Sequence, residues 1–195
     1  MFYLNKIFKI ILLFNFQFII CSGGFDHGSV VGKGRLQLDC TINPLDIIEF
    51  GQTYFVISYG LEEKIDIHGY FSNTPHENQI YFGLMYQFFS DEHIDLSTAI
   101  GPRFILEKID IFFPQLLYTI KLNKFNIGGS LVSVNDLTNN EFLGVAFDGA
   151  FFFPLKKIND SRTFIEEMEF AIGLFKNVSN VFYPTYSIDM KFKKF

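Results

Sequence analysis

The side chains most suited to chemistry in this sequence are charged residues that recur at every second position of apolar segments. Glu167 and Glu169 are two residues apart, as are Asp66 and His68. Two carboxylates on one strand face are groups that bind Ca²⁺ or act as an acid and a base, and a carboxylate beside a histidine fixes the imidazole tautomer. Neither pair is accompanied by further metal ligands or by a serine motif. We therefore expect no enzyme, no metal site and no cofactor here.

The segment 141–155 shows which element must position such charges. Its odd positions are nearly all apolar: Leu143, Val145, Phe147, Gly149, Phe151, Phe153 and Leu155. Its even positions are smaller, and one of them is Asp148. A period of two predicts a strand with two different faces. The apolar face is long enough to cross a bilayer, because a tilted membrane strand needs about 9–11 residues.

Much of the chain repeats this pattern. We expect ten strands separated by polar turns, at residues 35–42, 48–61, 64–71, 79–89, 94–105, 109–122, 125–134, 141–155, 164–175 and 182–192. Regular strand–turn units predict an antiparallel up-and-down meander. Eight strands are the alternative, if two of the less regular segments merge or fail. An even number places both ends of the chain on the same side, as in bacterial single-chain barrels.

The composition is rich in aromatic residues and poor in positive charge. Hydrophobic residues make up 49% of the 195 residues and aromatic residues 18%, with 27 Phe, 9 Tyr and no Trp. This composition fits a protein with aromatic belts at two membrane interfaces. The net charge of −5 and the lack of a basic cluster argue against a nucleic-acid partner.

The first 22 residues are predicted to be a cleaved signal peptide. Lys6 and Lys9 precede an apolar run at 10–20, and Cys21 and the small residues after it provide a cleavage region. The run is shorter than the roughly 20 residues of a transmembrane helix. A single domain at 23–195 would follow, beginning with a glycine-rich lead-in at 23–34, and Cys40 would be its lone thiol.

Taken together, the export signal, the alternating strands, the aromatic rims, the turn sequence at 59–67 and the terminal Phe195 resemble a small bacterial outer-membrane β-barrel over about residues 34–195. The resemblance implies an all-β protein, a closed antiparallel transmembrane barrel in the cell outer membrane in contact with its lipid. It also implies that Phe195 belongs to the signal read by the barrel-assembly machinery. Closure is expected on physical grounds as well, because an open sheet in lipid leaves unpaired backbone groups at its edges.

The charges on the second face are then expected to line a narrow lumen as a paired network. These residues are Arg35, Asp39, Lys64, Asp66, His68, Arg103, Asp148, Glu167 and Glu169. Arg103 and Asp148 are the candidates for gating a path for a small solute. The expected function is a structural role or passive transport of small solutes. The alternatives are a membrane-embedded lipid-modifying enzyme that uses His68, and a soluble periplasmic ligand-binding barrel whose apolar face points inward.

Overall fold

A computed structural model describes residues 27–42, 53–73, 78–105, 108–157, 163–176 and 182–194. They form ten strands: β1 (Leu36–Ile42), β2 (Thr53–Glu62), β3 (Ile65–Asn73), β4 (Asn78–Ser90), β5 (Ile94–Ile105), β6 (Lys108–Lys121), β7 (Asn126–Asp136), β8 (Glu141–Lys157), β9 (Ile165–Lys176) and β10 (Phe182–Phe192). The prediction of ten strands is confirmed, and the alternative of eight is wrong. No helix in the described ranges is long and apolar enough to cross a membrane. The predicted signal peptide lies outside these residues.

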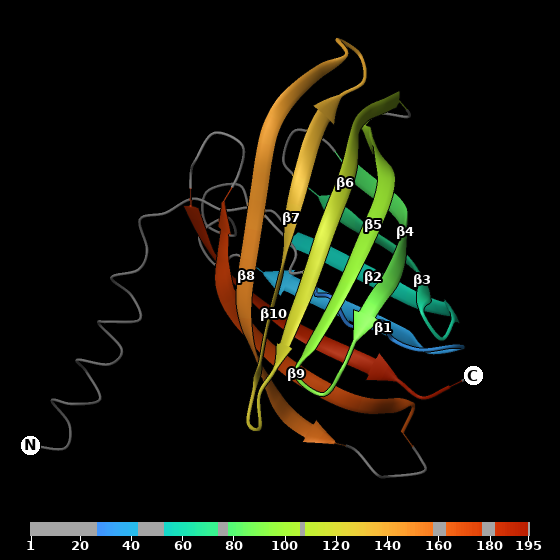
Figure 1. Ribbon diagram of the computed structural model, residues 1–195, viewed down its shortest axis with the longest axis vertical. Coiled ribbons are helices and arrows are strands. Elements are labelled where there is room, and N and C mark those ends of the chain that lie inside the picture. The colour runs from blue at the N-terminus through green and yellow to red at the C-terminus, as the bar shows by residue number, and fades with distance from the viewer. Residues whose placement is uncertain are drawn as a thin grey trace, which may run out of the picture.

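The ten strands close into a single antiparallel barrel (Figure 1). Each strand pairs with its neighbours in sequence, and β1 completes the circle by pairing with β10 from Gln37 opposite Lys191 to Ile42 opposite Tyr186. Closure leaves no edge strand, so the ladder satisfies the backbone N–H and C=O groups without help from solvent. The predicted up-and-down topology is confirmed.

The apolar face of the strands points away from the barrel interior. In β4, Phe82, Leu84 and Tyr86 are exposed, whereas the alternate residues Tyr81 and Met85 are buried. On β8, Leu143 and Phe151 are 41% and 47% exposed. This orientation is the opposite of what a soluble ligand-binding barrel requires. A largely apolar outer surface is instead what a sheet in contact with lipid hydrocarbon needs.

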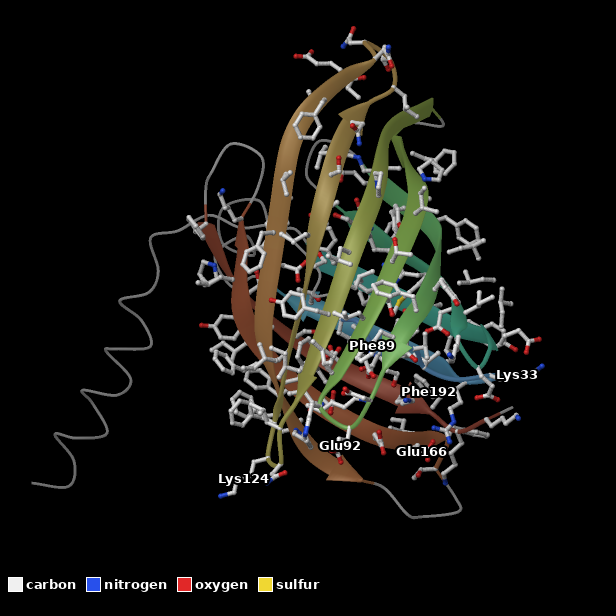
Figure 2. All side chains as sticks on the ribbon, in the orientation of Figure 1. Lys33, Phe89, Glu92, Lys124, Glu166 and Phe192 are labelled. Carbon is white, nitrogen blue, oxygen red and sulfur yellow. The ribbon has the colours of Figure 1, made fainter. Side chains whose placement is uncertain are left out.

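The two ends of the barrel differ. At the end that we call the turn end, short turns join β2 to β3, β4 to β5 and β6 to β7, and β1 begins and β10 ends there. Figure 2 shows Lys33, Glu92 and Lys124 at this end. At the far end the β7–β8 hairpin rises above the other strands (Figure 1). β8 has 17 residues and β6 has 14, against 7 in β1 and 9 in β3.

The depth of an outward residue in the bilayer should set the cost of placing a charge there. We expect Leu84→Arg, in the middle of β4, to lower the free energy of unfolding by about 2–4 kcal/mol, as for an arginine at the bilayer midplane. The matched control is Leu122→Arg, just beyond β6, which should cost about 0–1 kcal/mol because it lies near an interface. Denaturant unfolding in phospholipid vesicles measures both. Equal small effects would contradict the membrane orientation.

Candidate functional site

The lumen is lined mainly by polar and small side chains. The buried polar residues of the strands are Gln37, Asp39, Thr41, Ser58, Asp66, His68, Ser72, Gln87, Asp95, Ser97, Gln115, Thr119, Ser130, Asp148, Thr185, Ser187 and Asp189. They occupy the inward positions of the period-two pattern. Because buried polar groups are costly unless they are hydrogen-bonded, their partners decide what the interior can do.

Three carboxylates lie side by side on three neighbouring strands. Asp189 of β10 is directly opposite Asp39 of β1 and directly opposite Glu169 of β9. The next inward row has Lys191 opposite Glu167. Like charges placed opposite each other on a sheet repel, so this row needs nearby donors and cations. We call Asp39, Glu167, Glu169, Asp189 and Lys191, on β1, β9 and β10, the acidic wall.

Hydrogen bonds to neighbouring side chains offset part of this repulsion. Gln37 Nε2 donates to Asp39 Oδ1 at 3.0 Å, and Ser187 Oγ donates to Asp189 Oδ1. Lys191 follows two residues after Asp189 on the same face. The acidic wall is therefore partly compensated, with four carboxyl groups beside the single ammonium group of Lys191.

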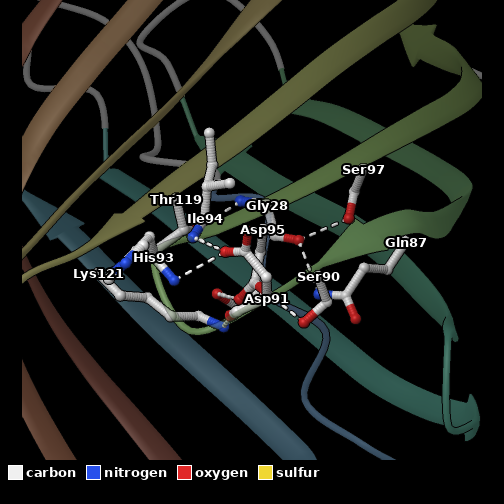
Figure 3. Close-up of polar contacts among 11 residues, drawn as sticks. Gly28, Gln87, Ser90, Asp91, His93, Ile94, Asp95, Ser97, Thr119 and Lys121 are labelled. Atoms are coloured by element: carbon white, nitrogen blue, oxygen red, sulfur yellow. Dashed lines mark hydrogen bonds and ion pairs between the residues drawn. The ribbon is translucent and has the colours of Figure 1, made fainter.

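The segment 27–34, which we call the strap, crosses the lumen near the turn end instead of joining the sheet. Gly28 N–H donates to Thr119 Oγ1 of β6 at 2.9 Å. The carbonyl of Gly28 accepts from Ser97 Oγ of β5 at 2.5 Å and from Gln87 Nε2 of β4 at 3.3 Å. Figure 3 shows these wall residues grouped around Gly28. The strap thus connects strands on one side of the barrel to each other through its backbone.

The strap continues from Gly28 to β2. Val31 N–H donates to Asp66 Oδ2 at 2.8 Å, and Gly34 N–H donates to the Gly60 carbonyl at 2.8 Å. Val31 is 2% exposed, and Val30 packs against a buried cluster of Met85, Ala99 and Leu117. Both polar and apolar contacts therefore hold the strap inside the barrel.

A cavity of about 190 Å³ remains beside the strap. Its lining residues come from the strap, from β1, and from the strands β6 to β10: His27, Ser29, Val30, Gln37, Thr119, Asn126, Phe152, Glu167, Glu169, Asp189 and Lys191. The strap fills the β2–β6 side of the lumen near the turn end, so the free space lies along the acidic wall. A solute in this space meets charged and amide groups.

Asp95 is a junction between the strap and the turn end. Its carboxylate accepts hydrogen bonds from Ser29 Oγ and Ser90 Oγ, each at 2.6 Å, and from Lys121 Nζ at 2.7 Å. Figure 3 shows Asp95, Ser90 and Lys121 together at the β4–β5 turn. The alternation of β5 indicates that Asp95 points inward, but Ser29 and Lys121 are 66 and 26 residues away along the chain, and no sequence pattern identifies them as its partners.

The residues predicted to form a lumen network divide into two groups. Asp39, Asp66, His68 and Asp148 are buried, and Arg103, Glu167 and Glu169 are half-buried; all seven lie on inward positions. Lys64 does not belong to the lumen, because it lies exposed in the β2–β3 turn. Arg35 precedes β1 and lies 3.6 Å from the outward-phase Glu166. Phe195 lies outside the described residues, so its role in assembly stays a prediction.

The two predicted gating residues occupy different settings. Asp148 of β8 accepts from Ser130 N–H at 2.8 Å and from Ser130 Oγ at 2.5 Å, which ties β8 to β7. Arg103 of β5 donates from Nη1 to Gln79 Oε1 of β4 at 3.4 Å. Both of these contacts join neighbouring strands, so both residues contribute to the wall of the barrel.

His68 lies where a lipid substrate would not meet it. Its Nδ1 is 3.4 Å from Ser58 Oγ on β2, and its ring contacts Tyr81 edge-to-face. All three side chains are buried within the lumen. The described contacts of His68 are with the walls of the lumen, and they give no support to that alternative.

Two groups outside the strands have shifted pKa values. The backbone N–H groups of His93 and Ile94 hydrogen-bond Asp91 in the β4–β5 turn and lower the pKa of that carboxyl. The hydrogen bond and charge of Glu62 raise the pKa of Lys33 on the strap. The Lys33–Glu62 ion pair, at 2.7 Å, lies in the open at the turn end. Exposed ion pairs contribute little to stability, so this pair does little to hold the strap in place. It marks the point at which the strap leaves the lumen.

Removing the carboxylate of Asp95 should destabilise the protein far more than removing an exposed acid of the same turn. We expect Asp95→Ala to cost about 2–4 kcal/mol, because Lys121 and two hydroxyl groups lose a charged acceptor. The matched control is Glu92→Ala, whose side chain is 85% exposed and lies 3.4 Å from the His93 ring nitrogen Nε2. It should change stability by less than about 0.5 kcal/mol. Denaturant unfolding of the detergent-solubilised barrel measures both changes in stability. Similar losses for the two variants would contradict the role of Asp95 as a junction.

Comparison with known proteins adds little beyond the fold. No family model matches the chain, and no curated protein matches it. Among solved structures, one titled "KdgM porin" aligns with a TM-score of 0.45 and 10% sequence identity, over 82% of this chain and 98% of that one. With a TM-score below 0.5, this alignment supports no conclusion about the chain. The closed ladder and the outward apolar wall carry the conclusion: this chain has the architecture of a small outer-membrane β-barrel.

Proposed function

We propose that this barrel lies in the cell outer membrane and provides a narrow passive path for ions and small polar solutes, with a preference for cations. The observation that carries the proposal is the cavity of about 190 Å³ along the acidic wall. Charged and amide groups line this space together with Val30 and Phe152, whereas the outer surface is apolar, and a water-filled path through a membrane needs polar groups inside.

The sign of the charge inside the barrel supports a preference for cations. The inward acids are Asp39, Asp66, Asp95, Asp148, Glu167, Glu169 and Asp189, whereas the cations that accompany them are Arg103, Lys121 and Lys191. A narrow space with low-dielectric walls concentrates the field of its charges. Rows of Asp and Glu in such a space favour the entry of cations.

The size of the cavity limits what the path admits. A water molecule occupies about 30 Å³ in the liquid, so the space holds a handful of waters or a solute of similar volume. Ten strands enclose a lumen that side chains largely fill, and the strap reduces it further. The function is therefore restricted to hydrated ions and small metabolites.

Recording from planar bilayers tests this function. We expect small discrete conductance steps and, under a KCl gradient, a reversal potential that indicates cation preference. The double variant Glu169→Gln, Asp189→Asn should reduce that preference severalfold, because it removes two charges of the acidic wall. The matched control is Glu166→Gln, on β9 but with the outward phase, which should leave the reversal potential unchanged. A bilayer that stays silent with inserted barrel would contradict the path.

A purely structural barrel is the second candidate, and one observation favours it. Tyr81 of β4 packs in a buried cluster with Val134 of β7 and Ala146 of β8, which bridges the lumen between opposite walls. Such a bridge stiffens the barrel and narrows any path. Recovery of the protein in the outer-membrane fraction, together with the silent bilayer, would select this role.

A further inference from the structure

The strap is attached to the barrel without being part of its ladder. Among the described residues of the strap, the one bridge to the sheet is the isolated pair of Lys33 with Gly60. The barrel closes independently of it, through the pairing of β1 with β10. Withdrawal of the strap would therefore leave every strand pair of the wall intact.

Most hydrogen bonds that hold the strap come from side chains of the wall, and the Gly34 N–H also donates to the backbone carbonyl of Gly60. Asp66 holds the N–H of Val31, and Asp95 holds the hydroxyl of Ser29. Gly28 is held through Thr119 and Ser97, whose hydroxyl groups can exchange this partner for water. An element held mainly by side-chain hydrogen bonds and by the packing of Val30 and Val31 can leave its site at a lower cost than a strand can leave a ladder.

The space for the strap is reserved by two glycines, one on each partner. A Cβ on Gly28 would come within 2.6 Å of the Asp95 carbonyl oxygen and 2.8 Å of Tyr118 Cα, both on the wall backbone. A Cβ on Gly60 of β2 would overlap the carbonyl of Gly32 in the strap. These neighbours are backbone atoms, so no side-chain rotation relieves either overlap. The strap fits in the lumen because both positions lack a side chain.

The strap also restricts the passage described above. It occupies the turn end of the lumen on the β2–β6 side, and Ser29 and Val30 form part of the lining of the remaining cavity. Any solute that travels along the acidic wall therefore passes beside the strap. Removal of the strap would join the cavity to the space that the strap now fills.

We propose that residues 27–34 are a displaceable plug, held across the turn end by Asp66 and Asp95, and that its release converts a narrow path into a wider one. The proposal rests on the passive path proposed above. It assigns the glycine-rich segment a regulatory role: the plugged state restricts flow, and the released state permits it.

Two substitutions from opposite partners should release the plug. Gly28→Val changes the strap, outside every strand, and Gly60→Val changes the wall. Each should give larger conductance steps than the unmodified protein in planar bilayers, because the side chain added at either position excludes the strap from the lumen. The matched control is Gly149→Ala on β8, where an added Cβ meets only side-chain atoms, at 3.2 Å or more, and should keep the original conductance. Heat-modifiable gel mobility verifies that each barrel is folded.

A thiol on the strap reports its position independently of current. Val31→Cys is introduced into a protein in which Cys21 and Cys40 are alanine, with and without Gly60→Val. Maleimide should label the buried thiol slowly in the first protein and at least tenfold faster in the second. A thiol that is equally protected in both proteins would overturn the placement of the strap on which the plug depends.

Labelling and conductance together distinguish the plug proposal from the proposal of a passive path. Faster labelling with larger conductance supports the plug. Faster labelling with unchanged conductance overturns the plug but leaves the path in place. Faster labelling with no current in any of the proteins overturns the path itself, and the plug with it.

Discussion

The whole structure depends on one constraint: in hydrocarbon, every backbone N–H and C=O must find a partner within the protein. An unpaired group there costs several kcal/mol, so a sheet with free edges is excluded. The pairing of β1 with β10 meets this constraint for the entire barrel. Once the sheet is closed, each strand has an outside and an inside, and the period of two in the sequence becomes a division between lipid and lumen.

Charged side chains are tolerated inside so small a barrel only where nearby groups compensate their burial. Asp148 and Asp95 are each held by donors on neighbouring segments, so they act as ties within the wall. Asp189 and Glu169 face each other instead, next to the remaining cavity. The charges that hold the barrel together are thus different residues from the charges that a solute in the cavity meets.

The sequence predicts the strands of the barrel well, but it does not predict which segment lies inside the lumen. Alternation over many residues is a strong signal, and it places Asp39, Asp66 and Asp148 on the inward face, where the structure has them. Lys64 departs from the pattern because β3 begins only at Ile65, so Lys64 lies in the turn that follows Glu62. A period of two does not mark the residue at which a strand begins.

The strap is the part that sequence reasoning missed. Its residues show neither a period of two nor a helical period, so they read only as a glycine-rich lead-in. Their placement depends on partners such as Asp95 and Asp66, which are 66 and 35 residues away along the chain. In the sequence, the strap is reflected in the glycines at positions 28 and 60. Their role can be interpreted only once the contact between the strap and the wall is known.

The unequal height of the wall has a consequence for the surrounding membrane. The strands β6 and β8 present 14 and 17 residues, whereas β1 and β3 present 7 and 9. Among the described residues, the tall side of the wall therefore offers outward positions over a greater height than the short side, so acyl chains packed against the two sides would meet walls of different height.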